Sequence, residues 1–146
     1  NGLRVEESDD LPAFWKILEQ VLRDKHHASP VHTVEEMQLL QSRFPEHIRL
    51  YAVYSADGRM LAGTVIYEMA HMVHAQYIAS SPEGKEFGAV DVLYIWLIDE
   101  RYADKRYLDF GVSTEQGGRV LNEGLVRQKE AFGARAVVYD SYNISL

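Results

Sequence analysis

The hydrophobic pattern of this chain changes its period in the middle third, and that change restricts the folds the chain can adopt. Residues 48–54, 60–67 and 71–79 are rich in the β-branched and aromatic residues that are typical of strands. Asp57-Gly58, between the first two segments, is a strong hairpin signal, because both central residues of a type I′ turn need positive φ. The pattern therefore predicts three consecutive strands in an antiparallel meander.

Helical signals precede the meander, after a short edge strand expected near residues 3–5. Asp10 and Pro12 are typical of a helix start. The buried stripe of this first helix would consist of Leu11, Phe14, Leu18, Val21 and Leu22. A second helix is predicted to begin at Thr33, where Glu36 completes a capping box, and to end before Pro45.

The chain after the meander again alternates between the two periods. Residues 87–102 are apolar on most sides, which favours a central, buried helix. A strand is predicted over 106–110, then a helix from a capping box at Ser113 to Phe132, and a last strand over 136–140. No linker interrupts the chain, so we expect a single α+β domain over residues 1–146, with a mainly antiparallel sheet between two helical layers.

Composition excludes several classes of function. The 146 residues include no cysteine, so disulfides, a cysteine nucleophile and thiolate zinc sites are absent, and we expect no metal site of other kinds. The net charge of −7 argues against binding to double-stranded nucleic acid. No apolar run is long enough for a membrane span and no signal peptide is recognisable, so we expect a cytoplasmic protein. Because the first residue is not methionine, we expect a domain cut from a longer chain.

One candidate site lies on the third predicted strand. Strict alternation places His74 and Gln76 on one face and Tyr77 on the other. Polar side chains in an apolar strand often mark a site, and histidine exchanges protons near neutral pH. The alternative is a hydrogen-bonded core histidine.

A second candidate is the segment between that strand and the apolar helix. Small residues there allow a close backbone approach, a helix N-terminus favours phosphate, and a lysine adds positive charge. The residues concerned are Ser81, Gly84, Lys85, Gly88 and Ala89. Such glycine-containing segments are more often ordinary loops.

A third candidate covers residues 107–135. Asp109 lies at the end of a predicted strand, where ligand contacts are frequent. Asn122 and Lys129 are seven residues apart, which places them on one face of the predicted helix. The alternative is a solvated helix face with ordinary charges.

These segments together carry a family resemblance, over roughly residues 70–140. They resemble the FemAB-like proteins, which are aminoacyl transferases of peptidoglycan precursors built from two GNAT-type domains. The chain is also similar to bacterial proteins described generally as GNAT acetyltransferases, through Pro30-Val31-His32 and Asn122-Glu123-Gly124-Leu125. The motifs that carry the FemAB likeness are Gln76-Tyr77, Ala79-Ser80, Tyr107, Asp109-Phe110-Gly111, Gly124-Leu125 and residues 129–133.

The resemblance implies a GNAT fold, with acyl-CoA held where two central strands splay apart. Residues 84–89 depart from the usual phosphate-binding turn. In the usual pattern of Asn, Tyr and Gly, Asn122 and Gly133 match, but Lys129 takes the place of the tyrosine. The resemblance implies acetyl-CoA as donor, or aminoacyl-tRNA if the FemAB likeness extends to chemistry. A preceding GNAT domain or a second copy of the chain would be its partner.

The implied reaction is attack of a small-molecule amine on an activated acyl group. His74, or Glu123 through a water, would remove a proton, and Lys129 with N–H groups of a bulged strand would stabilise the oxyanion. The residues expected to bind substrate are His32, Gln76, Tyr77, Asp109, Ser113 and Asn122. The alternative is a non-catalytic half of a two-domain enzyme, which binds substrate or packs against the working half.

Overall fold

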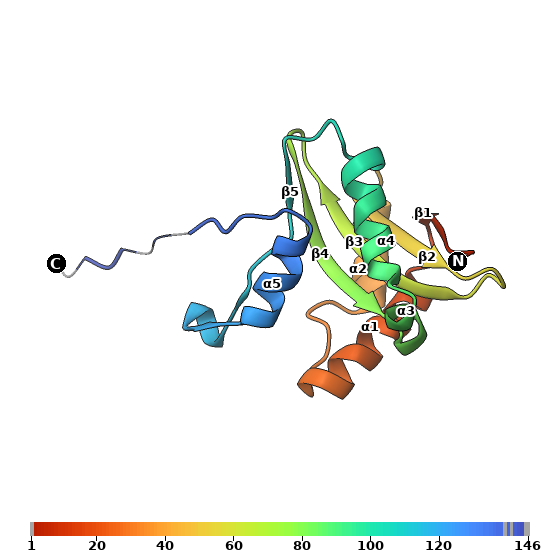
Figure 1. Cartoon of the computed structure of the whole chain (residues 1–146), viewed down its shortest axis with the longest axis horizontal. Coiled ribbons are helices and arrows are strands. Elements are labelled where there is room, and N and C mark those ends of the chain that lie inside the picture. The colour runs from red at the N-terminus through yellow and green to blue at the C-terminus, as the bar shows by residue number, and fades with distance from the viewer. Residues whose placement is uncertain (1, 139, 141, 145–146) are drawn as a thin grey trace. The chain divides into compact units, whose positions relative to one another are not determined.

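The computed structural model describes residues 2–138, 140 and 142–144, with the side chains of residues 25 and 26 excepted. The chain divides into two compact units, Asn1–Gly111 and Val112–Leu146, and each is described by itself (Figure 1). Among the described residues, no helix is long and apolar enough to cross a membrane.

The first unit is built on a sheet of five strands. They are β1 (Arg4–Ser8), β2 (Ile48–Tyr54), β3 (Met60–Glu68), β4 (Met72–Ser80) and β5 (Tyr107–Asp109). Their order in the sheet is β1-β2-β3-β4-β5. The strands β1 to β4 are antiparallel neighbours, whereas β5 runs parallel to β4. The predicted edge strand and meander are therefore confirmed.

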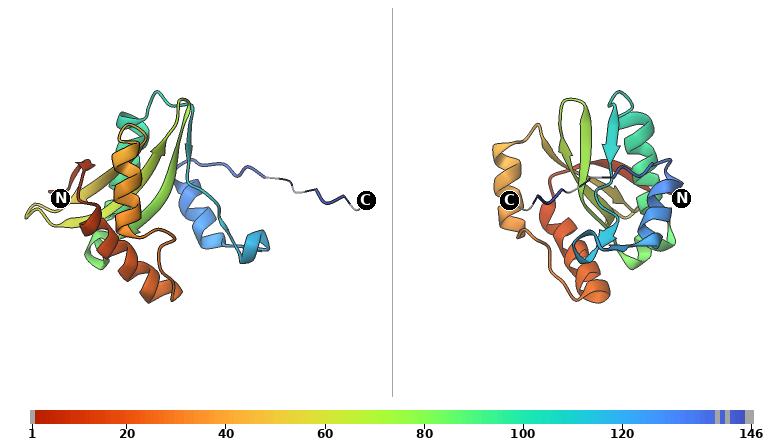
Figure 2. Two further views of the ribbon diagram at one scale, coloured as in Figure 1. Left: turned by 180° about the vertical axis from the view of Figure 1, so that it is seen from behind. Right: turned by 90° about the vertical axis from the view of Figure 1, so that its left-hand side faces the viewer.

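Helices cover both faces of this sheet, which confirms the expected three layers. On one face lie α1 (Leu11–His26) and α2 (Val34–Arg43), and the other carries α4 (Ala89–Trp96). Figure 1 shows α4 in front of the sheet, and the left view of Figure 2, from behind, shows α2 on the opposite face. The core on the α1 side includes Leu11, Phe14, Trp15, Leu18, Met37, Leu50, Val65 and Ala79.

Both predicted helix starts of the N-terminal region are confirmed by their caps. The Asp10 carboxylate accepts a hydrogen bond from the Ala13 N–H at 2.9 Å. Thr33 and Glu36 form the predicted capping box, with distances of 3.2 and 2.8 Å between the bonded atoms. These bonds satisfy N–H groups that have no partner within the helix, and they therefore stabilise the first turns.

The hairpin between β2 and β3 forms where it was predicted, but not with the predicted turn type. Gly58 has a φ of 82°, whereas the φ of Asp57 is not positive. A type I′ turn is therefore wrong. The pairing of β2 with β3 shifts by one residue next to Tyr54, and this local irregularity accommodates the different turn.

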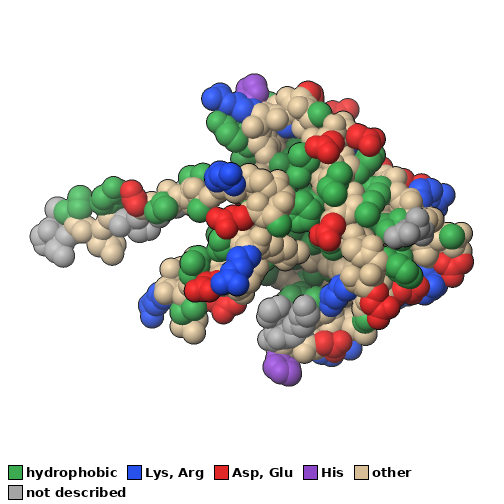
Figure 3. All heavy atoms as spheres, viewed as in Figure 1, with side chains coloured by type: hydrophobic (Ala, Val, Ile, Leu, Met, Phe, Trp, Pro, Cys, Tyr) green, Lys and Arg blue, Asp and Glu red, His purple; other side chains and the backbone are tan. Residues whose placement is uncertain are grey.

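The apolar segment after β4 is more divided than predicted. A short helix, α3 (Pro82–Glu86), comes first, and Gly88, with a φ of 65°, separates it from α4. A π-helical turn, η1 (Leu97–Arg101), then extends α4. The expectation of a buried helix holds for one side of α4 only, because Ala89, Leu93 and Tyr94 are buried whereas Val92 and Ile95 are exposed. Apolar side chains are visible over α4 in Figure 3.

The second unit departs most from the predicted elements. It contains β6 (Thr114–Glu115), a 3₁₀ turn η2 (Gln116–Gly118), β7 (Val120–Leu121) and α5 (Glu123–Ala131). The helix predicted from Ser113 therefore begins ten residues late. The reason is the pair Gly117-Gly118, whose φ values of 67° and 89° form a hairpin turn that a helix interior does not permit.

The predicted last strand is also wrong. Residues 136–138 and 140 have no regular secondary structure, and residue 139 lies outside the described residues. A strand needs a neighbouring strand for its hydrogen bonds, and the only ladder among the described residues of this unit joins β6 to β7.

Candidate active site at the divergence of two strands

The central feature of the first unit is the short contact between β4 and β5. The two strands pair only at Met72 with Tyr107, Val73 with Leu108 and His74 with Asp109. Beyond His74, β4 continues to Ser80 with no strand partner on that side among the described residues. Its backbone N–H and C=O groups on this edge are therefore available for an extended ligand.

A bulge in β4 lies directly after the divergence. Ile66 of β3 pairs with Ala75, and the next residue back, Val65, pairs with Tyr77, so Gln76 is the extra residue. Bulges of this kind turn backbone groups away from the ladder and are frequent beside active sites. The bulged strand expected from the family resemblance is therefore present, and it is centred on Gln76.

The bulge also changes which side chains share a face. Paired residues point to the same side of a sheet, so Tyr77 follows Val65 and His74 follows Tyr67 toward the α1 side. Tyr67 and Tyr77 both pack against the core on that side. The predicted separation of His74 from Tyr77 is therefore wrong, because strict alternation ignores the inserted residue.

His74 and Asp109 form a hydrogen-bonded pair at the divergence. The distance between His74 Nδ1 and Asp109 Oδ2 is 2.8 Å, and the side chains are 27% and 39% exposed. The other oxygen of Asp109 accepts a hydrogen bond from the Gly111 N–H at 2.8 Å. The carboxylate thus orients the imidazole and favours a proton on Nδ1, which leaves Nε2 as the basic nitrogen.

A second polar pair lies on the same face. Nδ1 of His32, in the segment between α1 and α2, is 2.7 Å from the Tyr77 hydroxyl. The backbone carbonyl of His32 accepts a hydrogen bond from Trp15 Nε1 at 3.3 Å, and the rings of Trp15 and Tyr77 meet edge to face. Burial raises the pKa of nearby Tyr67, and the neighbouring Tyr77 adds to this effect.

In the proposed phosphate-binding segment, Ser81 and Gly84 are already engaged in the local fold. Ser81 caps α3 by accepting a hydrogen bond from the Gly84 N–H at 3.0 Å. Gly84 itself is needed for packing, since a Cβ atom there would lie 2.4 Å from the Leu61 carbonyl oxygen. Ala89 is buried and Lys85 is exposed. Gly88 is the N-cap of α4, and no side chain of this N-cap residue bonds the first turn of the helix.

Of the candidate site residues in the third segment, Asp109 lies in the first unit, and Ser113, Asn122, Glu123 and Lys129 lie in the second. The side-chain oxygen of Asn122 caps α5 by accepting a hydrogen bond from the Leu125 N–H, and its side-chain NH₂ donates to Glu115 at 2.7 Å. The backbone N–H of Asn122 donates to the Ser113 carbonyl. The Lys129 ammonium donates a 2.7 Å hydrogen bond to the Val112 carbonyl. Glu123 is exposed and pairs with Arg127 at 3.3 Å.

Sequence reasoning missed two features of this site. The pairing of His74 with Asp109 was not predicted, because the register of two strands 35 residues apart leaves no local signal. Trp15 was also missed, although a tryptophan inside a predicted buried stripe is a usable signal, since its N–H needs a partner when buried.

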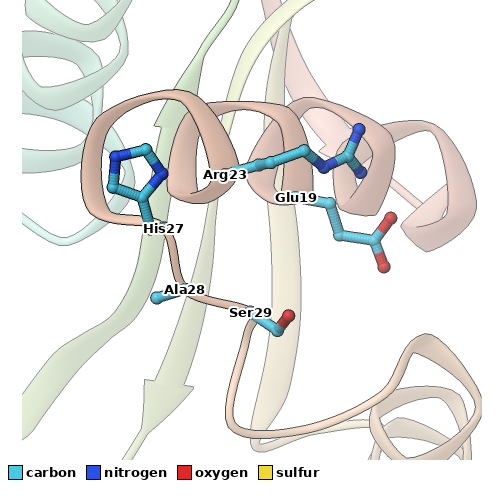
Figure 4. A pocket seen from close by; sticks show the side chains of 5 residues that line it. All are labelled: Glu19, Arg23, His27, Ala28 and Ser29. Atoms are coloured by element: carbon cyan, nitrogen blue, oxygen red, sulfur yellow. The ribbon is translucent and has the colours of Figure 1, made fainter.

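A hollow of about 510 Å³ lies elsewhere, beside the C-terminal part of α1 (Figure 4). It is lined by Glu19, Arg23, His27, Ala28 and Ser29, all of them exposed. None of the residues proposed from the sequence lines this hollow, so it does not compete with the divergence as the candidate site. The described residues contain no group of three or more potential metal ligands.

Comparison with known proteins agrees with the fold. Residues 2–116 match the family model described as an acetyltransferase (GNAT) domain. The chain belongs to this family. No curated protein sequence is significantly similar to it.

Solved structures of acetyltransferases share the fold at low sequence identity. A possible acetyltransferase from Clostridium difficile 630 is 12% identical with a TM-score of 0.70, over 100% of this chain and 99% of that one. AAC(6')-Iy, solved with the bisubstrate analogue CoA-S-monomethyl-acetylneamine, is 12% identical with a TM-score of 0.65, over 98% and 100%. The ribosomal-protein-S18-alanine N-acetyltransferase from Escherichia coli is 21% identical with a TM-score of 0.64, over 90% and 76%.

Proposed function

We propose that this domain is an N-acetyltransferase that transfers an acetyl group from acetyl-CoA to a small-molecule amine. The observation that carries the proposal is the divergence of β4 and β5 with the His74–Asp109 pair at its start. Membership of the GNAT acetyltransferase family supports the reaction class, and the CoA analogue bound to AAC(6')-Iy supports the donor.

The free edge of β4 fits the extended arm of acetyl-CoA. Residues 75–80 offer backbone donors and acceptors along one line, as an added strand would require. The bulge at Gln76 supplies N–H groups that are turned out of the ladder and suited to polarise the acyl carbonyl. Gly88, at the N-terminus of α4, is the position that we assign to the phosphates.

In the proposed reaction, the amine nitrogen attacks the thioester carbonyl carbon. His74 Nε2 takes the proton that the nitrogen loses, the C–S bond of the thioester breaks, and the leaving thiolate takes a proton from the His74 imidazolium or from water. Asp109 keeps the imidazole oriented and stabilises the imidazolium that forms. The mechanism needs no residue to form a covalent intermediate, because the amine is itself the nucleophile.

The remaining residues are assigned to the acceptor and to the oxyanion. His32 and Tyr77 lie on the same face as His74, so we assign them to the amine acceptor. Lys129 of the second unit is proposed as a cation for the oxyanion on the family resemblance alone; within that unit its ammonium donates a hydrogen bond to the Val112 carbonyl. Glu123, exposed and paired with Arg127, is a weaker candidate base than His74.

A second candidate function is a binding domain without catalysis, as half of a FemAB-like two-domain protein or as one copy in a homodimer. The phosphate segment favours this alternative, because Ser81 and Gly84 are engaged in the structure of α3. Asp91 adds a negative charge near Gly88, which opposes phosphate binding. An aminoacyl-tRNA donor would need a basic surface, which the net charge of −7 does not favour.

The proposal is tested by thiol release from acetyl-CoA in the presence of a panel of primary amines: glycine, spermidine, tyramine and a peptide with an N-terminal alanine. We expect amine-dependent thiol release by the wild type, and a loss of roughly 10²-fold or more in His74→Gln. Arg59→Gln, far along the sheet at the β2–β3 turn, serves as the matched control. Acetyl-CoA binding without release for any amine would favour the binding domain instead.

A further inference from the structure

The pairing of β4 with β5 is too short to hold its own register. It consists of three residue pairs, in a parallel arrangement that is somewhat less stable per residue than an antiparallel one. His74 and Asp109 form the last pair, after which the strands separate. A slip of one residue would place Leu108 opposite His74 and turn Asp109 to the other face. The hydrogen bond of the pair therefore depends on whatever fixes the upstream end of β5.

The upstream end of β5 is attached to the β3–β4 turn through the backbone. The His71 carbonyl accepts hydrogen bonds from the N–H groups of Arg106 and Tyr107, at 3.1 and 3.2 Å. The Lys105 N–H in turn binds the Tyr102 carbonyl at 3.0 Å, where η1 ends. The position of the turn at residues 69–71 thus decides which residue of β5 lies opposite Met72.

The side chain of Lys105 holds this turn. Its ammonium lies 3.0 Å from the Met69 carbonyl oxygen, 3.5 Å from that of Ala70 and 3.1 Å from Oε1 of Glu68. A lysine ammonium has three donors, and all three have an acceptor here. The Lys105 side chain is only 15% exposed, so these interactions are weakly screened by solvent.

Glu68 connects the same ammonium to the helix that precedes β5. Its Oε2 accepts a hydrogen bond from the Tyr102 hydroxyl at 3.1 Å. The guanidinium groups of Arg49 and Arg101 lie 3.5 and 3.6 Å from the same oxygen. One carboxylate, 17% exposed, thus joins β2, the end of η1 and the segment before β5.

We propose that Lys105, held by Glu68, is a positioning residue for the His74–Asp109 pair. It lies outside the divergence and takes no part in proton transfer. It secures the β3–β4 turn to the start of β5, and so keeps His74 opposite Asp109. The inference rests on the proposed function for its catalytic meaning, but the positioning itself is measurable without an acceptor.

The test follows the proton on His74 Nδ1 by ¹H–¹⁵N NMR in the full chain. Asp109→Ala marks the signal expected when the pair is lost. In Lys105→Met we expect exchange of the Nδ1 proton with water to be about tenfold faster than in the wild type, the size expected from weakening one hydrogen bond. Glu68→Gln, which keeps its shape and a hydrogen-bonding partner for Tyr102, should change the signal in the same direction.

Two further variants keep the test specific. Lys105→Arg retains a cation in reach of the same carbonyl groups and should restore slow exchange. Arg59→Met removes a solvent-exposed ion pair, that with Glu83, and should leave the His74 signal unchanged. Unchanged exchange in both Lys105→Met and Glu68→Gln would overturn the proposal. If exchange accelerates while acetyl-CoA turnover is unchanged, the positioning holds and the catalytic role of His74 fails.

Discussion

His74 and Asp109 occupy the last pair of β4 and β5, and their side chains lie 2.8 Å apart at the point where the strands separate. An imidazole oriented by a carboxylate therefore lies beside a free strand edge and a bulge. In the proposed function, the strand edge would bind the extended donor and the imidazole would accept the proton of the amine.

The Asp109 carboxylate should contribute to turnover and not to the binding of acetyl-CoA. In Asp109→Asn, the amide does not stabilise the imidazolium, so acetyl-CoA turnover should fall roughly 10²-fold while the donor affinity stays within about twofold. Steady-state kinetics and calorimetry measure the two effects separately. Full turnover in this variant would show that His74 acts without Asp109, or does not act.

The hydrogen bond between His32 and Tyr77 should stabilise the segment between α1 and α2. We expect Tyr77→Phe and His32→Ala to be coupled by about 1 kcal/mol in a double-mutant cycle of urea unfolding, because each removes the partner of the other. Trp15→Phe provides a comparison, since it removes the bond to the His32 carbonyl and leaves the Tyr77 hydroxyl in place. Strictly additive changes in the free energy of unfolding would contradict the hydrogen bond between His32 and Tyr77.

Glu68 should make stability depend on pH. Burial by itself would raise the pKa of this carboxyl, but hydrogen bonds from Lys105 and Tyr102 and the charges of Lys105 and Arg101 bring its pKa below the ordinary value of 4.5. A carboxyl with a depressed pKa in the folded state stabilises the protein above its unfolded pKa, and this contribution is lost as pH falls through the folded value.

The comparison that isolates this effect is Glu68→Gln. The wild type should be more stable than the variant at pH 7, and the difference should shrink as the pH is lowered below about 4.5. Urea unfolding at pH values from 3 to 7 measures the difference. If the difference in stability between the wild type and Glu68→Gln stays constant over this range, the contribution of Glu68 comes from its shape and not from its charge.

Two glycines in helices should respond to alanine in opposite ways. Gly84→Ala forces a Cβ against the Leu61 carbonyl, so we expect a loss of about 1–3 kcal/mol in the free energy of unfolding. In Gly124→Ala, the nearest atom lies at 3.6 Å, and α5 should gain about 0.5–1 kcal/mol, seen as slower amide exchange in that helix. A neutral Gly84→Ala would refute the close packing of α3.

The sequence predicts the first unit better than the second, for physical reasons that individual residues illustrate. Caps such as Thr33 with Glu36, and strands of β-branched residues, are local signals that the packing of the core reinforces. The bulge at Gln76 has no such signal, because the extra residue is defined only against β3, and it placed Tyr77 on the unexpected face.

The helix start predicted in the second unit is wrong because two local signals in the sequence conflict. Ser113 with Gln116 has the pattern of a capping box, but Gly117-Gly118 follows at once and favours a turn over a helix. Asn122, three residues before the apolar Leu125, is the cap that the chain uses. Asn122→Ala should therefore destabilise α5 by about 1 kcal/mol, and Ser113→Ala should leave its amide exchange unchanged.

The central claim, that acetyl-CoA lies along the free edge of β4, is tested most directly by an NMR titration of the ¹⁵N-labelled chain. With acetyl-CoA, and not with an equal concentration of adenosine alone, we predict saturable changes in the amide signals of residues 75–80 and of Gly88. No change in these signals at millimolar acetyl-CoA, or changes confined to other parts of the chain, would contradict the account.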